Sequence, residues 1–195
     1  MSQERVSRAR WRGLLALLLA IAALQALPAC VRTLLRHEPQ ALAAGQWWRL
    51  LSAHWIHLSG AHAALNACGL VLCCALADAT WSTGRLLARM AMLGMGISLL
   101  LWALSPQTTD YVGMSGVLYG LMVWMLLPAL RARRDGMAAL MLLLVLAWLG
   151  WQSWAGPDPR EEMLIGGYIV TQAHWFGALG GLVGALASGR TRPLA

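Results

Sequence analysis

The stretch GMSGVLYGLMVWMLLP, residues 113–128, is almost wholly apolar, yet a serine, Ser115, lies near its start. About 16 residues make a helix of roughly 24 Å, which is shorter than the ~30 Å hydrocarbon core of a bilayer. If its Pro128 end reaches one membrane face, the preceding residues 105–112 must dip inward from the other. Irregular backbone at such depth is tolerated only where it lines a wet cavity or is buried in protein. The stretch therefore predicts a serine that meets water inside a membrane.

The rest of the chain supports a membrane location. Of its 195 residues, 59% are apolar and only 12% are charged, and the mean hydropathy is +0.60. Soluble domains carry about 25% charged residues, so the composition argues against an ordinary cytosolic enzyme. The apolar runs predict six membrane-spanning helices, at about 13–31, 61–80, 86–104, 113–128, 137–155 and 165–187. The predicted class is an all-α polytopic membrane bundle over 13–187, with tails at 1–12 and 188–195.

Arginine supplies all fifteen basic side chains, and their distribution predicts the orientation. With the N-terminus in the cytoplasm, eleven arginines lie inside and four outside, which satisfies the positive-inside rule. Both termini are therefore expected in the cytoplasm, and residues 1–12 lead into a first anchor rather than a cleaved signal. The arginines form no patch interleaved with aromatic residues, so no nucleic-acid partner is expected.

One outer connection, residues 32–60, is rich in large apolar side chains, including Trp47, Trp48 and Trp55. Tryptophan prefers the membrane interface. We expect short helices there, lying partly in the outer leaflet. The cysteines, at positions 30, 68, 73 and 74, show no disulfide or metal spacing and are interpreted as small apolar residues.

Ser115 and His174 are the polar residues that stand out most within the apolar runs. His174 is predicted about ten residues into the last run, roughly 15 Å along its helix, where a histidine is costly. An imidazole can take the proton of a serine hydroxyl and return it to a leaving amine. No carboxylate lies in either run, so the pattern predicts a dyad, with Asp110 a weak candidate for a third member. Small residues at Gly116, Gly120, Gly177 and Gly181 predict that the two helices touch.

His57, His62 and Asn66 form a second polar group, of pattern H-x4-H-x3-N. His62 and Asn66 share a helix face, and both can donate hydrogen bonds to an oxyanion. Structural alternatives stay open: an interhelical hydrogen bond for Asn66 or His174, and a bond from Ser115 to its own helix. A zinc site at His54, His57 and His62 with Cys68 is disfavoured, because the glutamate of H-E-x-x-H is missing. No metal and no cofactor are expected.

Taken in order, these residues resemble the rhomboid intramembrane serine proteases. Trp48-Arg49 resembles the W-R of the family's first outer loop, and His57, His62 and Asn66 match its H-x4-H-x3-N. The segment 113–116 matches G-x-S-G, and Ala173-His174 opens an A-H-x-x-G-x-x-x-G that ends at Gly181. In its size and in residues 111–116, the chain resembles the rhombosortase subfamily.

The resemblance implies a role for each matching position. Ser115 would be the nucleophile and His174 the general base, with Asn66, His62 and the Ser115 N–H as the oxyanion site. Tyr119 would support His174, and Gly116 and Gly177 would let two helices close. The remaining matched positions, Trp48, Arg49 and His57, would hold the outer loop.

The function expected from this resemblance is that of a serine endopeptidase of the bacterial inner membrane. Its partners would be the lipid bilayer and membrane-anchored proteins with a C-terminal transmembrane segment. Rhombosortases are implied to process secreted proteins that bear a C-terminal Gly-Gly signal, by hydrolysis or by transfer to another amine. The alternative is a catalytically inactive rhomboid-like protein that binds transmembrane helices. A small transporter is disfavoured, because no inverted repeat is evident.

Overall fold

The computed structural model describes residues 3–77, 81–133 and 135–188, and over these ranges the chain is helical. Its only bridging pair in those ranges is His37 with Tyr111, which confirms the all-α class. The longer helices are α1 (Gln3–Gln25), α5 (Gly60–Leu76), α6 (Thr83–Leu104), α7 (Ser115–Arg133), α8 (Gly136–Ala155) and α10 (Thr171–Ser188). The shorter ones are α2 (Ala29–Thr33), α3 (Pro39–Ala43), α4 (Arg49–Ser52), η1 (Ala53–Trp55) and α9 (Pro159–Ile165).

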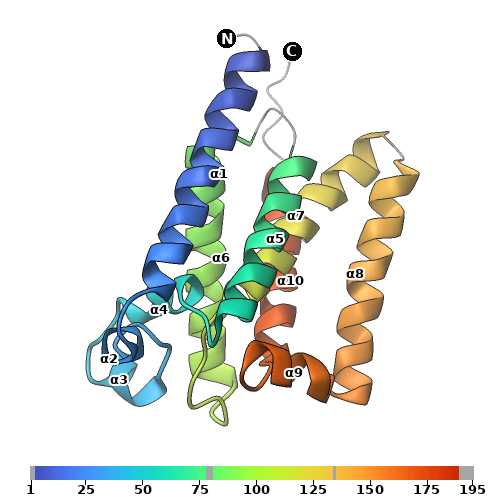
Figure 1. Cartoon of the computed structure of the whole chain (residues 1–195). Coiled ribbons are helices and arrows are strands. Elements are labelled where there is room, and N and C mark those ends of the chain that lie inside the picture. Colours follow the sequence, from blue (N-terminus) through green and yellow to red (C-terminus); the bar gives the residue numbers. More distant parts are fainter. Residues whose placement is uncertain (1–2, 78–80, 134, 189–195) are drawn as a thin grey trace.

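The long helices form an up-and-down bundle with α10 near its middle and α1 and α8 at opposite sides (Figure 1). The start of α1 and the end of α10 lie at the same end of the bundle (Figure 1). By length and composition, α6 and α8 can each cross a membrane, and α4–η1 with α5, bent by 93°, would make a third span. The chain is thus a membrane protein, while the count of six spans stays a prediction.

Two predicted spans have different boundaries in the structure. The predicted start of the run 165–187 is wrong, because Ile165 is the last residue of α9. Gly166, with φ +85°, caps α9 and donates its N–H to Glu162 O at 2.9 Å. Helix α10 begins only at Thr171, so His174 lies roughly 4.5 Å along it, and the predicted 15 Å is wrong. Pro128 does not end the fourth helix. Helix α7 starts at Ser115 and continues through this proline to Arg133, so it is longer than the sequence predicted.

Residues 105–114 connect α6 to α7 without helical structure, and the residues just before Ser115 are buried. Tyr111, Val112 and Met114 are each less than 7% exposed. The backbone of Tyr111 pairs with that of His37, and Gly113 N–H donates to Ala53 O at 2.9 Å. The irregular backbone ahead of Ser115 is therefore partly buried in protein and partly lines a cavity, the two settings that allow such backbone within a membrane.

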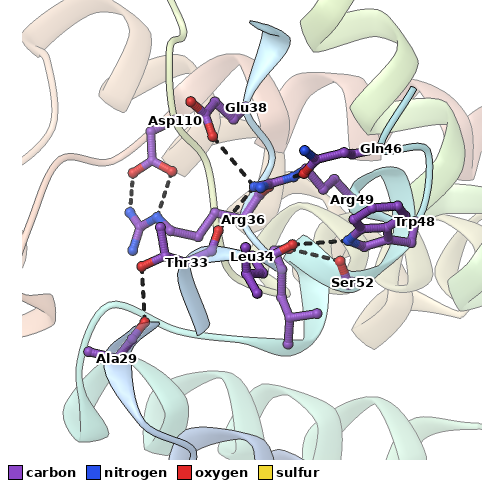
Figure 2. A network of polar contacts seen from close by, with 11 residues as sticks. Ala29, Thr33, Leu34, Arg36, Glu38, Gln46, Trp48, Arg49, Ser52 and Asp110 are labelled. Atoms are coloured by element: carbon purple, nitrogen blue, oxygen red, sulfur yellow. Dashed lines mark hydrogen bonds and ion pairs between the residues drawn. The ribbon is translucent and has the colours of Figure 1, made fainter. Parts of the chain in front are cut away.

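The connection 32–60 contains the expected short helices, and Arg49 links its turns by hydrogen bonds. The guanidinium is 3% exposed and donates to the carbonyls of Thr33 and Arg36 at 3.0 and 2.8 Å (Figure 2). Nearby, the Trp48 indole donates to Leu34 O at 3.0 Å (Figure 2). These contacts fit the structural roles that the resemblance implies for Trp48 and Arg49.

Helices α7 and α10 make the most extensive contact of any helix pair, and glycines let their backbones approach. A Cβ atom at Gly116 would lie 2.7 Å from Ala173 O, and one at Gly120 would lie 2.7 Å from Gly177 O. A Cβ at Gly177 or Gly181 would clash more severely, with the carbonyls of Gly116 and Gly120. The predicted contact between these two helices is confirmed.

Gly181→Ala should therefore lower the free energy of unfolding by about 1–3 kcal/mol, because backbone cannot yield as a flexible side chain can. The matched control is Gly150→Ala on α8, where a Cβ would meet nothing within 4 Å. In an open helical position alanine stabilises by about 0.5–1 kcal/mol. Unfolding in mixed detergent micelles measures both, and equal effects would contradict the packing argument.

Candidate active site

Ser115 and His174 meet where α7 and α10 begin. Ser115 is the first residue of α7, and His174 lies in the first turn of α10. The Ser115 Oγ lies 2.9 Å from His174 Nε2, and His174 is 6% exposed. The close approach of the two helices through their glycines brings the side chains together. The predicted juxtaposition of these residues is thus present in the structure.

Two side chains hold the imidazole from its other sides. The ring of Tyr119, one turn below Ser115 on α7, lies tilted against it, with centroids 4.7 Å apart. Gln152, near the end of α8, places its Oε1 3.2 Å from His174 Nδ1 and is 2% exposed. The family resemblance implies Tyr119 at this place, whereas Gln152 was not predicted. Its signal in the sequence is an uncharged polar residue within the fifth apolar run, 137–155.

Asp110 is not a third member of this group. Its carboxylate forms a two-pronged ion pair with Arg36, in which Nε lies 2.6 Å from Oδ1 (Figure 2). The weak candidacy of Asp110 is therefore wrong, because a nearer cation engages the side chain.

His62 and Asn66 lie beside the loop that leads to Ser115. A Cβ atom at Gly113 would lie 2.7 Å from His62 Nε2 and 3.7 Å from Asn66 Nδ2. The backbone N–H of Leu58 donates to His62 Nδ1 at 3.4 Å, which leaves Nε2 as the protonated nitrogen of a neutral ring. The Asn66 Nδ2 is buried and has no hydrogen-bond partner among the described residues. Two unengaged donors therefore lie close to the serine.

Gly113 makes this close approach possible. Its φ of +114° disfavours any side chain, and the space a Cβ would take is filled by His62. The Tyr111 hydroxyl donates to Gly113 O at 2.8 Å and fixes the turn. The chain therefore enters α7 with Ser115 directed at His174, and the first N–H groups of the helix lack intrahelical acceptors.

A cavity of about 950 Å³ adjoins these residues. Ser115, His174, His62 and Asn66 line it, together with apolar side chains of α5, α7 and α8 such as Leu65, Met122 and Leu144. Charged side chains also line it: Arg36, Asp110 and Glu161. Such a cavity can hold an extended peptide with apolar and polar parts beside the Ser–His pair.

Glu161, in the first turn of α9, is the acidic residue of the cavity wall whose pKa is shifted. Partial burial raises the pKa of its carboxyl, and the neighbouring charge of Asp158 adds to this rise. An interaction with the Gln152 side chain acts in the opposite direction. The Gln152 side chain thus favours the charged form of the Glu161 carboxyl, while burial and Asp158 oppose it.

No metal-ligand group of three or more His, Cys, Asp or Glu side chains forms within the described ranges. His54 instead hydrogen-bonds Gly94 O and the Ser98 hydroxyl, both at 2.9 Å. The ring of His57 lies edge-on to His62, with centroids 5.0 Å apart. All four cysteines are free thiols, and Cys73 and Cys74 are part of the apolar core.

Two comparisons with known proteins bear on the family of this chain. Residues 44–191 match the rhomboid domain. The chain is also similar to the rhomboid protease GluP of Bacillus subtilis (strain 168), with 25% identity over 150 residues, or 75% of this chain. The match spans about a quarter, 26%, of that relative's length. Because the domain match covers most of the chain, including Ser115, Asn66 and His174, the protein belongs to the rhomboid family.

Proposed function

We propose that this protein is an intramembrane serine protease that uses a Ser115–His174 dyad. The observation that carries the proposal is the 2.9 Å contact between Ser115 Oγ and His174 Nε2 at the wall of a large cavity. The family and the apolar helices support a substrate that is itself a membrane protein. The 2.9 Å contact also weighs against the inactive helix-binding alternative, since such a protein has no need of the pair.

The reaction follows from the positions of the atoms. His174 Nε2 takes the Ser115 proton as Oγ attacks a peptide carbonyl, and a tetrahedral oxyanion forms. Asn66 Nδ2, the His62 Nε2–H and the Ser115 N–H are the proposed oxyanion donors. His174 then gives its proton to the leaving amine, which leaves an ester on Ser115. Water, or another amine, releases the ester and regenerates the hydroxyl.

The supporting residues have separate roles in this proposal. Tyr119 limits the rotation of the His174 ring, and Gly116 and Gly177 let α7 and α10 come close enough for the dyad to form. No cofactor is needed for these steps.

The finer proposal is that of a rhombosortase. The resemblance of residues 111–116 supports it, and the substrates would be secreted proteins with a C-terminal Gly-Gly, transmembrane helix and basic tail. The proposed site is the bacterial inner membrane, with both termini cytoplasmic and the membrane domain at 13–187. The C-terminal tail, 188–195, lies outside the described residues except for Ser188.

The test uses the full chain in liposomes with two single-span reporters, one with Gly-Gly before its helix and one with Leu-Leu. We expect cleavage of the Gly-Gly reporter, and mass spectrometry of the new C-terminus identifies a free carboxylate or a transferred amine. Equal cleavage of both reporters would contradict the rhombosortase assignment alone. Binding of both without cleavage would favour the inactive helix-binding alternative.

A further inference from the structure

Gln152 is a buried amide whose only hydrogen-bond partner within the described ranges is His174. Its Oε1 lies 3.2 Å from His174 Nδ1, and it comes from α8, a helix that contributes neither member of the Ser–His pair. At 2% exposed it is shielded from water. A buried amide is costly unless it makes hydrogen bonds, so this contact requires an explanation.

The contact determines which ring nitrogen carries the proton. An amide oxygen can only accept, so Nδ1 must be the protonated nitrogen when it faces Oε1. Nε2 is then unprotonated and can accept from the Ser115 hydroxyl, which is the arrangement a general base needs. A histidine side chain free in water prefers the opposite tautomer, with the proton on Nε2. The amide oxygen therefore selects the form that can act on serine.

If the Gln152 amide were rotated by about 180°, its nitrogen would donate to Nδ1, and the Nε2–H tautomer would be favoured instead. The Gln152 side chain also lowers the pKa of the Glu161 carboxyl and so favours its charged form. The amide nitrogen is buried and has no hydrogen-bond partner among the described residues. A carboxylate can only accept, so a side chain that favours its charged form presents the amide nitrogen to Glu161 and leaves the oxygen for His174.

We infer that Gln152 is a positioning residue, which holds His174 in the Nδ1–H tautomer and thereby makes Nε2 available as the base for Ser115. The inference rests on the proposed function for its consequence in catalysis. Its structural part, the tautomer, does not depend on activity.

Gln152→Met should lower kcat by about 10-fold, the size expected from the loss of one net hydrogen bond. KM for the reporter should stay unchanged, because the amide is directed at His174 rather than at substrate. Gln152→Glu keeps an acceptor oxygen at the same reach and should retain activity within about 3-fold of wild type. Gln40→Met on the exposed face of α3 is the matched control and should change neither quantity.

The deciding measurement is nitrogen NMR of the full chain in detergent with labelled histidine, in which His174→Ala identifies the His174 signals. We expect the Nδ1–H tautomer in wild type and a shift toward Nε2–H in Gln152→Met. An Nε2–H wild type, or an unchanged tautomer with unchanged kcat in Gln152→Met, would overturn the inference. If Gln152→Met does not fold, the wild-type tautomer and the activity of Gln152→Glu decide.

This experiment separates the inference from the proposed function. A wild type that never reacts with a serine-directed probe contradicts the protease, whatever its tautomer. A reactive wild type whose His174 does not respond to Gln152→Met contradicts the positioning role alone.

Discussion

Ser115→Ala should abolish both the reaction of the protein with a fluorophosphonate probe and the cleavage of reporter substrates. The probe bonds only to an activated oxygen, and Ser115 Oγ has a histidine nitrogen at 2.9 Å. Loss of the nucleophile in a soluble serine protease lowers kcat by on the order of 10⁶-fold. Labelling of the purified protein in detergent, read by in-gel fluorescence, measures this effect directly.

The matched control is Ser82→Ala. Ser82 also lies at a helix start, where its hydroxyl accepts from the Arg85 N–H, but no histidine bond to it is formed within the described ranges. Its loss should cost about 1 kcal/mol of stability as a missing N-cap and should leave labelling unchanged. Labelling that persists in folded Ser115→Ala would identify another nucleophile and end the proposed mechanism.

The sequence was sufficient to predict that Ser115 and His174 lie together and which polar residues lie near them. Ser115, His174, His62 and Asn66 are polar residues in apolar surroundings, and such residues are few because the membrane makes them costly. Glycines at spacings of four predicted the α7–α10 contact for the same reason, since close backbone approach needs small residues. These signals consist of residue types and their spacing, so a single sequence is enough to find them.

Other features depend on contacts that a linear pattern does not contain. Apolar composition continues through Gly166, so the run 165–187 looked like one helix, and only the left-handed glycine divides it. Pro128 resembled a helix end, but packing carries α7 past it. Gln152 is 22 residues from His174 in sequence, and only the docking of α8 places them together.

His174→Ala should be nearly as damaging as Ser115→Ala, and the double variant should be no worse than Ser115→Ala alone. Without the imidazole the Ser115 hydroxyl keeps its proton and is a poor nucleophile. Residues that act as one unit have strongly non-additive effects, so removing the second member costs little once the first is gone.

Three variants and wild type therefore form a cycle, read as initial rates of reporter cleavage with folding checked by thermal unfolding. The structural alternative for His174, a hydrogen bond that merely joins helices, predicts a different outcome. His174→Ala would then lower stability without loss of rate per folded molecule, and its effects would add to those of Ser115→Ala. Because Tyr119 and Gln152 also contact the ring, the catalytic and the structural role of His174 both predict some loss of stability in His174→Ala. The rate of reporter cleavage per folded molecule distinguishes the two roles.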